Sequence, residues 1–283
     1  MRCMNLRFDV NCSILFTGLP LLDRPAAARA AGFEAVEFWW PWDVAVPSAR
    51  EADRFVTALG DAGVRLAALN FFAGDLAAGE RGLLSDPMRI SEFRDSVDVG
   101  VDIAARTGCT VLNALYGNRP GRDELAILNL MIAARAAAPA GATLVIEALN
   151  SYDCPRYPVT SSETAIEVID AVRADGAPNV GFLADVYHLG RMGEDLTSVL
   201  ASPYVTHVQV ADVPGRGAPG TGSLDFPALF SALAAAGYPG WIGCEYLGVT
   251  SFDWLADLHH KDMGNAIATE RDYRTPPTTT PAA

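Results

Sequence analysis

Oxygen-bearing side chains stand at the ends of consecutive apolar segments in the second half of the chain. LVIEALN (144–150) reaches Glu147, VGFLADVYH (180–188) reaches Asp185, YVTHVQVAD (204–212) reaches Gln209 and WIGCEYL (241–247) reaches Glu245. Carboxylate and amide oxygens are the ligands that hard divalent cations prefer, and a pair of carboxylates can also move a proton. Either chemistry requires that these four side chains lie together in the folded protein.

An alternation of apolar runs and helical stretches predicts the elements that position them. Runs typical of strands occur at 6–11, 34–40, 64–71, 109–115, 142–149, 179–186, 204–212 and 241–247. Ala- and Leu-rich stretches with helical spacing lie between them, at 20–32, 48–63, 89–108, 123–141, 161–176 and 225–240. Ser161 or Ser162 predicts the start of one of these helices, because a serine hydroxyl can accept a bond from a free amide of the first turn.

Eight strand–helix repeats favour one α/β domain, a single (β/α)8 TIM barrel, over an open doubly wound sheet. The loop after the first strand also lacks the GxGxxG spacing that a dinucleotide-binding sheet would carry. We expect the barrel to span residues 1–264. Residues 265–283 contain several prolines and no apolar period, which predicts a disordered tail.

Composition excludes several classes of function. The net charge is −13 and no Lys/Arg-rich stripe is interleaved with aromatic residues, which argues against nucleic-acid binding. No run of 18 apolar residues and no N-terminal apolar leader occurs, so we expect a cytoplasmic protein without a membrane span. The five cysteines are scattered without CxxC spacing, which argues against a disulfide framework or a structural zinc site.

The barrel explains why the four strand-end side chains matter. Parallel strands of a TIM barrel present their carboxyl ends at one rim, where the active site lies. Three carboxylates gathered there would repel one another and raise each other's pKa unless a cation neutralised them. The oxygen ligands Glu147, Asp185, Gln209 and Glu245 therefore predict a divalent metal, Mg²⁺ or Mn²⁺, in preference to zinc.

Longer motifs resemble a known family. VEFWWPWD, AGDLAAGERG, IEALNSYDCP, DVYHLGRMGEDL, HVQVADVPGRGAPGTG and GWIGCEY are similar to segments of the hydroxypyruvate isomerase family of xylose isomerase-like TIM barrels. The resemblance runs from about Leu6 to about Asp257. It implies a divalent metal held by Glu, Asp, Gln or His, and Glu in that chain order, which falls on the four residues named above.

The resemblance also implies a reaction, an aldose–ketose type isomerisation of a small hydroxy-oxo acid. The leading substrate is hydroxypyruvate, converted to tartronate semialdehyde through an enediolate. Glu147 and Glu245 are the pair expected to remove and return the proton, and the sequence does not say which acts as base and which as acid.

Two side chains are the strongest candidates for substrate binding. His188 lies where related isomerases and epimerases use an imidazole to hold substrate oxygens, and a structural hydrogen bond is the alternative. Arg216 stands in a Gly-rich loop and suits bidentate pairing with a substrate carboxylate, with a solvated surface position as the alternative. His207 shares the strand parity of Gln209, so it either supports the site or packs in the barrel.

Weaker candidates come from the loops. Asp153 matches a position that contacts substrate in the family, although an Asx turn would explain it equally well. Asn70 is a further candidate for substrate binding. Glu80 and Arg81 belong to a glycine-rich loop expected to close over the mouth and exclude water. The tryptophans of WWPW (39–42) either wall the pocket or pack against a partner subunit of a homo-oligomer, and packing in the core is the alternative for at least one of them.

Two departures from the family pattern bear on the substrate. Members of the family carry Lys after GCEY and Glu after GTG, where this chain has Leu247 and Ser223. The departures weaken the case for hydroxypyruvate more than the case for an isomerase. A 2-oxo-tetronate isomerase, a ketose 3-epimerase and a non-catalytic sugar-acid-binding barrel therefore remain alternatives.

Overall fold

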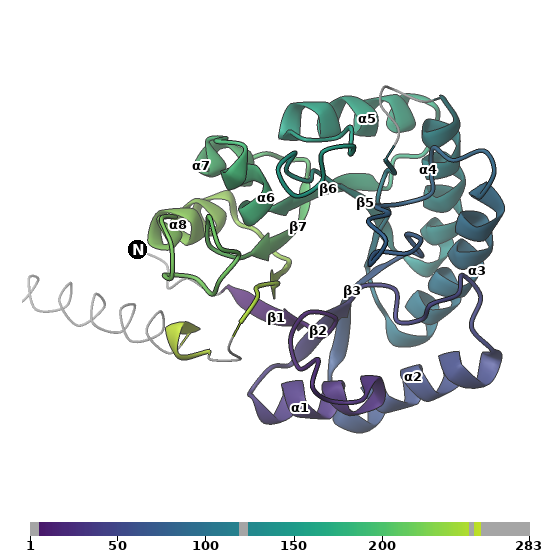
Figure 1. Ribbon diagram of the computed structural model, residues 1–283, viewed down its shortest axis with the longest axis horizontal. Coiled ribbons are helices and arrows are strands. Elements are labelled where there is room, and N and C mark those ends of the chain that lie inside the picture. Colours follow the sequence, from purple (N-terminus) through teal and green to yellow (C-terminus); the bar gives the residue numbers. More distant parts are fainter. Residues whose placement is uncertain (1–5, 119–123, 249–251, 256–283) are drawn as a thin grey trace, which may run out of the picture.

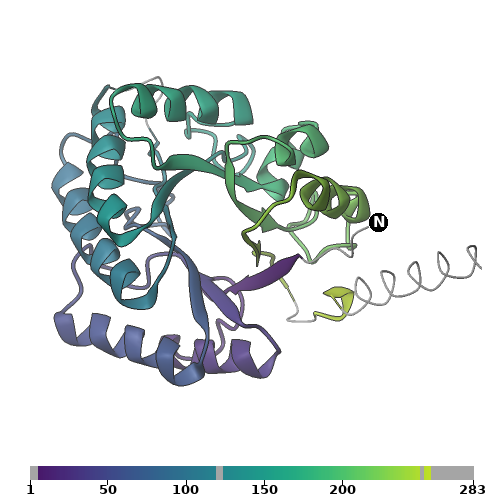
Figure 2. The same cartoon turned by 180° about the vertical axis from the view of Figure 1, so that it is seen from behind.

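The chain folds as a closed barrel of parallel strands with helices on its outside (Figures 1 and 2). The computed structural model describes residues 6–118, 124–248 and 252–255. The strands are β1 (Arg7–Asn11), β2 (Ala35–Phe38), β3 (Arg65–Asn70), β4 (Val111–Asn113), β5 (Thr143–Glu147), β6 (Val180–Asp185), β7 (Val205–Val210) and β8 (Trp241–Cys244). Each lies within a range predicted from the sequence, so the TIM-barrel prediction is confirmed.

Closure brings the first and last strands side by side. β1 pairs with β8 in parallel, with Arg7 opposite Trp241 and Val10 opposite Cys244. Every other strand pairs in parallel with its sequence neighbours, in the order β1 to β8. All carboxyl ends therefore meet at one rim, which is the arrangement that the strand-end oxygens require.

Helices follow the strands and cover the barrel. They are α1 (Arg24–Ala30), α2 (Ala49–Ala62), α3 (Ile90–Thr107), α4 (Glu124–Ala137), α5 (Ser162–Ala174), α6 (Val186–Arg191), α7 (Leu196–Leu200) and α8 (Phe226–Ala236), with 3₁₀ turns η1 (Leu21–Asp23) and η2 (Ala138–Ala140). Ser161 caps α5, as predicted, because its hydroxyl accepts from the amide of Thr164. Gly63 ends α2 in the left-handed conformation that lets the chain turn directly into β3.

The interior of the barrel has an apolar side and a polar side. Ala68, Val111, Val145 and Leu183 form an apolar cluster of their own, below the rim on β3 to β6. Asp9, Glu37 and His207 are equally buried, at most 1% exposed, but lie on β1, β2 and β7. The larger apolar core lies between the sheet and the helices. Below the rim, this buried polar cluster therefore lies on β1, β2 and β7, whereas the residues of the apolar cluster lie on β3 to β6.

Other sequence predictions concern the thiols and the ends of the chain. Cys12, Cys109, Cys154 and Cys244 are free and buried. Among the described residues, no helix is both long enough and apolar enough to cross a membrane. The predicted tail, residues 265–283, lies outside the described residues, as does the end of the predicted barrel domain from 256 to 264.

Candidate active site at the carboxyl rim of the barrel

The four predicted metal ligands come to the same end of the barrel. Glu147 and Asp185 are the last residues of β5 and β6, and Glu245 directly follows β8. Gln209 lies on β7 directly opposite Asp185, so the two side chains share one face of the sheet. All four are buried, with at most 5% of each exposed.

Asp185 and Glu147 form the centre of this group together with His188. Single ligand atoms from these three residues lie within 4.8 Å of one another. Glu147 Oε2 accepts a hydrogen bond of 2.8 Å from Asn113 Nδ2, at the end of β4. Asp185 Oδ1 accepts from the backbone amide of Tyr187 at 2.8 Å and so caps α6. One oxygen of each of these two carboxylates is thus held by a hydrogen bond, which fixes the orientation of both side chains.

Glu245 and Gln209 are connected through residues that the sequence analysis missed. Asn11 Nδ2, at the end of β1, donates to Glu245 Oε2 at 3.0 Å and to Glu37 Oε1 at 3.0 Å. Gln209 Nε2 donates to the same Glu37 oxygen at 2.7 Å. A signal was present, because Glu37 interrupts the apolar run EAVEFWW in the middle of a buried strand.

Arg216 is the cation of the site. Its Nη2 lies 2.6 Å from Glu245 Oε1 and 3.6 Å from Asp185 Oδ2. The residue has φ +54°, a left-handed conformation that is unfavourable for a side chain and is held here by the surrounding loop. Asp212 orders that loop by accepting from the amides of Gly220 and Gly222 at 3.0 and 2.8 Å. The surface alternative for Arg216 does not hold, since only 18% of its side chain is exposed.

The carboxylates carry more negative charge than Arg216 can offset. Burial, reinforced by the charge of Asp185, raises the pKa of Glu147 to about 8. Burial raises the pKa of Asp185 to about 6, although Arg216 opposes the shift. The pKa of Glu245 is also raised well above its usual range, again chiefly by burial. A second cation would let all three ionise at neutral pH.

Two buried oxygens in the group have no hydrogen-bond partner among the residues that the structure describes. They are Asp185 Oδ2 and Gln209 Oε1, and each belongs to a predicted metal ligand. A buried acceptor without a partner is costly, and a metal ion would satisfy both. Their donor chemistry, carboxylate and amide oxygen, fits Mg²⁺ or Mn²⁺. The residues present therefore suit a divalent metal.

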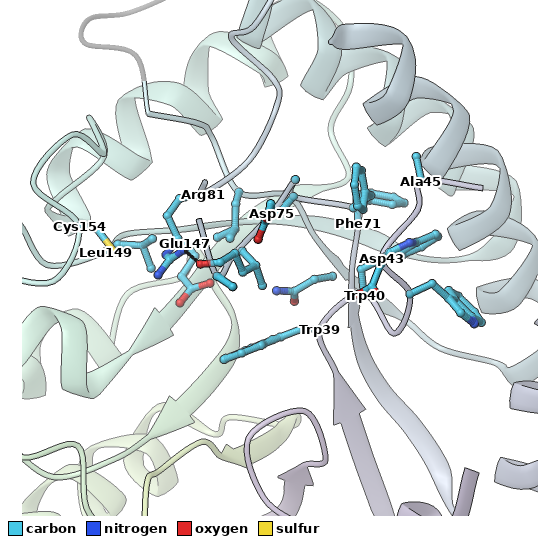
Figure 3. A pocket seen from close by; sticks show the side chains of 18 of the residues that line it. Trp39, Trp40, Asp43, Ala45, Phe71, Asp75, Arg81, Glu147, Leu149 and Cys154 are labelled. Carbon is cyan, nitrogen blue, oxygen red and sulfur yellow. Dashed lines mark hydrogen bonds between the residues drawn. The ribbon is translucent and has the colours of Figure 1, made fainter. Parts of the chain in front are cut away.

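A cavity of about 870 Å³ opens above this group. Figure 3 shows Glu147, Arg81 and Cys154 at one end of it and Trp40, Asp43 and Ala45 at the other. Predicted substrate-binding residues that line the cavity are Asn70, Arg81, Asp153, His188 and Arg216. The tryptophans of WWPW also line it, as in the pocket-wall alternative.

His188 has a defined tautomer. Its Nδ1 accepts a bond of 3.0 Å from the amide of Asn150, so Nε2 carries the proton in the neutral ring. Burial holds the pKa of His188 well below its usual range, so the ring is neutral at neutral pH. His188 Nε2 lies 3.7 Å from Asp185 Oδ2 and can donate to an oxygen held beside that carboxylate.

Asp153 and Glu80 are held by other protein groups. Asp153 Oδ2 accepts from Asn150 Nδ2 at 2.9 Å and from the hydroxyl of Tyr187 at 2.7 Å. Its amide donates to Asn150 Oδ1 at 2.9 Å, so the side chain that closes this turn is that of Asn150 and not that of Asp153. Glu80 pairs with Arg89 at 2.5 Å and accepts from the amide of Asp75, and it is not among the residues that line the cavity. Glu80 therefore shapes the loop, while the neighbouring Arg81 lines the cavity.

Comparison with known proteins identifies the family. A family model described as xylose isomerase-like TIM barrel matches residues 25–264. A Streptomyces coelicolor protein provisionally named a hydroxypyruvate isomerase is 53% identical over 88% of this chain and 95% of its own length. The chain belongs to the hydroxypyruvate isomerase family. The resemblance stated from the sequence motifs is thereby confirmed.

Two further relatives show the breadth of the family. A 2-oxo-tetronate isomerase from Cupriavidus necator is 35% identical over 85% of this chain and 92% of its own length. A Brucella melitensis structure titled AP endonuclease, family 2, is 37% identical, covers 85% of this chain and 93% of its own, and superposes with a TM-score of 0.77. The fold and the family are thus shared by proteins whose names differ.

Proposed function

We propose that this member of the hydroxypyruvate isomerase family is a metal-dependent isomerase of a small hydroxy-oxo acid, interconverting hydroxypyruvate and tartronate semialdehyde (2-hydroxy-3-oxopropanoate). The observation that carries the proposal is the gathering of Glu147, Asp185, Gln209 and Glu245 at one rim, with an unpartnered oxygen on two of them. The chain is an isomerase by its relatives, since the protein 53% identical to it bears that name.

The four rim residues would hold Mg²⁺ or Mn²⁺. When bound, the metal supplies Lewis-acid stabilisation of the negative charge that develops on the substrate oxygens. The protein's own contribution is to hold the ligands in position and to bury them from solvent. Asn113 holds Glu147, Asn11 holds Glu245, and the amide of Tyr187 holds Asp185.

Glu147 and Glu245 would transfer the proton between the two adjacent carbons. They approach the cavity from β5 and from the end of β8, and both line it. In the metal-free protein burial raises the pKa of Glu147 to about 8. A bound cation would oppose this shift, so Glu147 would be ionised in the loaded protein and able to accept a proton. One carboxylate removes a proton from the hydroxymethyl carbon to form the enediolate, and the other group, in its protonated form, delivers a proton to the neighbouring carbon. The hydroxyl proton passes from the first substrate oxygen to the second, so the aldehyde and the new hydroxyl group form together.

Arg216 and His188 would orient the substrate. The guanidinium of Arg216 can turn from Glu245 towards a substrate carboxylate, because it has several donors and Nε has no partner among the described residues. Arg81, which also lines the cavity, offers a second guanidinium. His188 Nε2 would donate to a substrate hydroxyl or carbonyl oxygen.

A 2-oxo-tetronate isomerase is the second candidate, and the departure from the family pattern at Leu247 favours it. A cavity of about 870 Å³ leaves room beyond a three-carbon acid, and the extra space runs towards Trp40 and Trp42. Leu247, which replaces the family lysine, is 53% exposed and offers no charge for an anion. The cavity accommodates a four-carbon acid as well as hydroxypyruvate.

One experiment tests reaction and substrate together. Protein loaded with Mg²⁺ or Mn²⁺ is incubated in D₂O with hydroxypyruvate, 2-oxo-tetronate or a free ketose, and the products are followed by proton NMR. We expect formation of the isomeric product and exchange of solvent deuterium at the carbon next to the carbonyl. A metal-loaded protein that turns over none of these compounds would overturn the proposal and favour a non-catalytic sugar-acid-binding barrel.

Glu147→Gln and Glu245→Gln are the controls for this assay. Each keeps the size of the side chain but cannot accept the proton. Both should lose isomerisation and deuterium exchange while the substrate still binds. Exchange that persists in both variants would show that other groups carry the proton.

A further inference from the structure

Glu37 connects several buried polar side chains inside the barrel. It stands on β2 with 1% of its surface exposed, and its carboxylate accepts three side-chain hydrogen bonds. Oε1 accepts from Asn11 at 3.0 Å and from Gln209 at 2.7 Å, and Oε2 lies 2.6 Å from His207 Nε2. This carboxylate does not line the cavity, so its role concerns the residues around it and not the substrate.

The bond to Gln209 decides which end of an amide faces the metal site. An amide side chain has an NH₂ donor at one end and an oxygen acceptor at the other. Because Glu37 takes the NH₂ group, Gln209 Oε1 is left buried and without a hydrogen-bond partner in the described part of the chain. In the reversed orientation the amide oxygen would face the Glu37 carboxylate, and the NH₂ group would face the cation. Both contacts would be repulsive.

The hydrogen bond between Glu37 and Asn11 also orients Glu245, because Asn11 donates to both carboxylates. Asn11 Oδ1 is occupied by the amide of Ser13 at 2.9 Å, so its NH₂ group has a fixed direction. That NH₂ group bridges Glu37 Oε1 and Glu245 Oε2 at 3.0 Å each. One carboxylate on β2 thus orients two predicted ligands, Gln209 directly and Glu245 through Asn11.

The lack of a side chain at Gly243 of β8 leaves space for the Glu37 carboxylate. A Cβ built on Gly243 of β8 would lie 2.7 Å from the carboxylate carbon and both carboxylate oxygens of Glu37. Such a contact would push the carboxylate out of position without removing its charge. Gly243 belongs to the GWIGCEY segment, which also contains Glu245.

We infer that Glu37 is a positioning residue that sets the ligand geometry of the metal site. This inference rests on the metal site of the proposed function. Glu37 fixes Gln209 with its oxygen towards the ion and, through Asn11, holds Glu245 in line. Partners that orient metal ligands in this way typically contribute a factor of about 10 to 100 to metal affinity.

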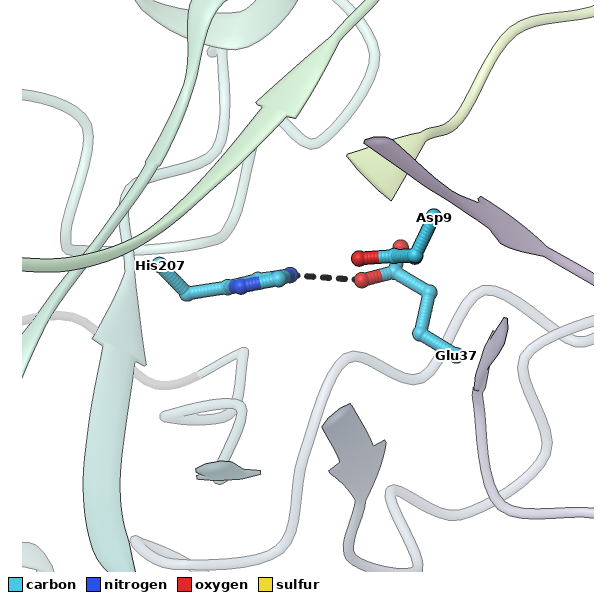
Figure 4. A group of neighbouring side chains, drawn as sticks. All are labelled: Asp9, Glu37 and His207. Atoms are coloured by element: carbon cyan, nitrogen blue, oxygen red, sulfur yellow. Dashed lines mark hydrogen bonds and ion pairs between the residues drawn. The ribbon is translucent and has the colours of Figure 1, made fainter. Parts of the chain in front are cut away.

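Asp9 supplies the matched control. Figure 4 shows its carboxyl group beside that of Glu37, across from His207. Asp9 is fully buried, and neither of its oxygens has a hydrogen-bond partner in the described part of the chain. Among the described residues it forms no hydrogen bond to Gln209 or Glu245, so Asp9→Asn perturbs the same cluster without removing a bond to either ligand.

The test is calorimetric titration of chelator-treated protein with Mn²⁺, which measures affinity and the number of ions bound. Glu37→Gln should bind Mn²⁺ about 10 to 100 times more weakly than the wild type. Asp9→Asn should bind close to wild type. Gly243→Ala, which keeps the Glu37 charge but displaces it, should fall between them. Melting of each metal-free protein reports whether the variant is folded, and Gly243→Ala carries the test if Glu37→Gln does not fold.

A double-mutant cycle separates positioning from general damage. In a Gln209→Glu background the ligand is a carboxylate with two equivalent oxygens, so it has no wrong orientation. In this background Glu37→Gln should weaken Mn²⁺ binding little, or should strengthen it, because it removes the repulsion between Glu37 and the new carboxylate at position 209. The same loss in both backgrounds would contradict positioning.

Three other outcomes would also overturn the inference. Equal Mn²⁺ affinity in wild type and Glu37→Gln would remove the role of Glu37 while leaving the proposed isomerase intact. Two ions in wild type and one in Asp9→Asn would show that Asp9, Glu37 and His207 bind an ion themselves. Absence of Mn²⁺ binding in wild type would overturn this inference and the metal dependence of the proposed function together.

Discussion

The two halves of the barrel bring different chemistry to the same rim. β1, β3 and β4 end at Asn11, Asn70 and Asn113, whereas β5 and β6 end at Glu147 and Asp185 and Glu245 follows β8. The first half thus supplies amides at its strand ends, and the second half supplies carboxylates, except on β7, where the rim residue is the amide Gln209. In β2 the polar residue, Glu37, stands one position before the end of the strand.

Amides and carboxylates are paired across this division. Asn113 donates to Glu147, and Asn11 donates to Glu245. An ionised carboxylate can only accept, so it needs a donor to hold it. An amide donor orients the carboxylate but leaves its charge uncancelled, whereas a lysine or arginine would neutralise it. The first half of the barrel therefore fixes the direction of the negative charges and leaves them available to a cation and a proton.

The largest effects should come from the carboxylates. We expect Glu147→Gln and Glu245→Gln each to lower kcat by a factor of about 10² to 10⁴, the usual contribution of a general acid or base. Steady-state kinetics with saturating Mg²⁺ measures this loss. Asp43→Asn, which changes a carboxylate lining the far end of the cavity, is the control and should retain kcat. Equal losses in all three variants would point to cavity charge in place of proton transfer.

Arg216, the cation of the second half, should have the next largest effect. A hydrogen-bonded charge pair contributes about 1.5 to 3 kcal/mol, so Arg216→Gln should raise KM for a hydroxy-oxo acid by a factor of about 10 to 100. Arg191→Gln is the matched control, because Arg191 lies on α6, bonds the carbonyl of Pro214 and does not line the cavity. An unchanged KM in Arg216→Gln would mean that another group, such as Arg81, binds the carboxylate.

The sequence was sufficient for the second half of the site and insufficient for the first. Glu147 and Asp185 could be placed because an apolar run stops at each, and parallel strands of a barrel share one rim. Asn11 and Asn113 are neutral and end short strands, so nothing in their own segments distinguishes them from ordinary polar residues. Their role depends on partners 234 and 34 positions away, which only the closed barrel brings into contact.

The contacts of two further residues could not be predicted from the sequence either. Glu37 is a charged residue inside a buried strand, which is costly without partners, and this cost is a usable signal. Its partners, Gln209 and His207, are 172 and 170 positions distant and could not be read from the sequence. Glu80 was predicted at the substrate because of its loop motif, and the structure instead places it against Arg89, nine positions away.

Loss of an amide donor should cost less than loss of a carboxylate. Asn113→Ala removes the bond to Glu147 Oε2, and a single hydrogen bond contributes about 0.5 to 1.5 kcal/mol, so we expect kcat to fall by a factor of about three to ten. Asn129→Ala is the control, because Asn129 is a buried amide on α4 that bonds the carbonyl of Leu84 far from Glu147. Asn129→Ala should lower the melting temperature without lowering kcat. The opposite pattern would contradict the pairing of the two halves.

The smallest expected effect concerns the pH dependence of stability in the metal-free protein. Burial raises the pKa of Glu147 from its ordinary value of 4.5 to about 8, so between these values the folded state holds a proton that the unfolded chain has lost. The folded state binds more protons in this range, and the free energy of unfolding therefore falls as the pH rises. Glu147→Gln has no such proton.

Thermal melts from pH 5 to pH 8 with chelator present measure this effect. The melting temperature of the wild type should fall relative to Glu147→Gln as the pH rises, by about 2 to 4 °C for each kcal/mol. Saturating Mg²⁺ should reverse the trend, because a metal binds the ionised carboxylate and displaces its proton. A metal-free wild type that keeps a constant offset from Glu147→Gln at every pH would mean that the amide of Asn113 and the guanidinium of Arg216 already keep Glu147 ionised. In that case the donors around it would supply charge compensation as well as direction.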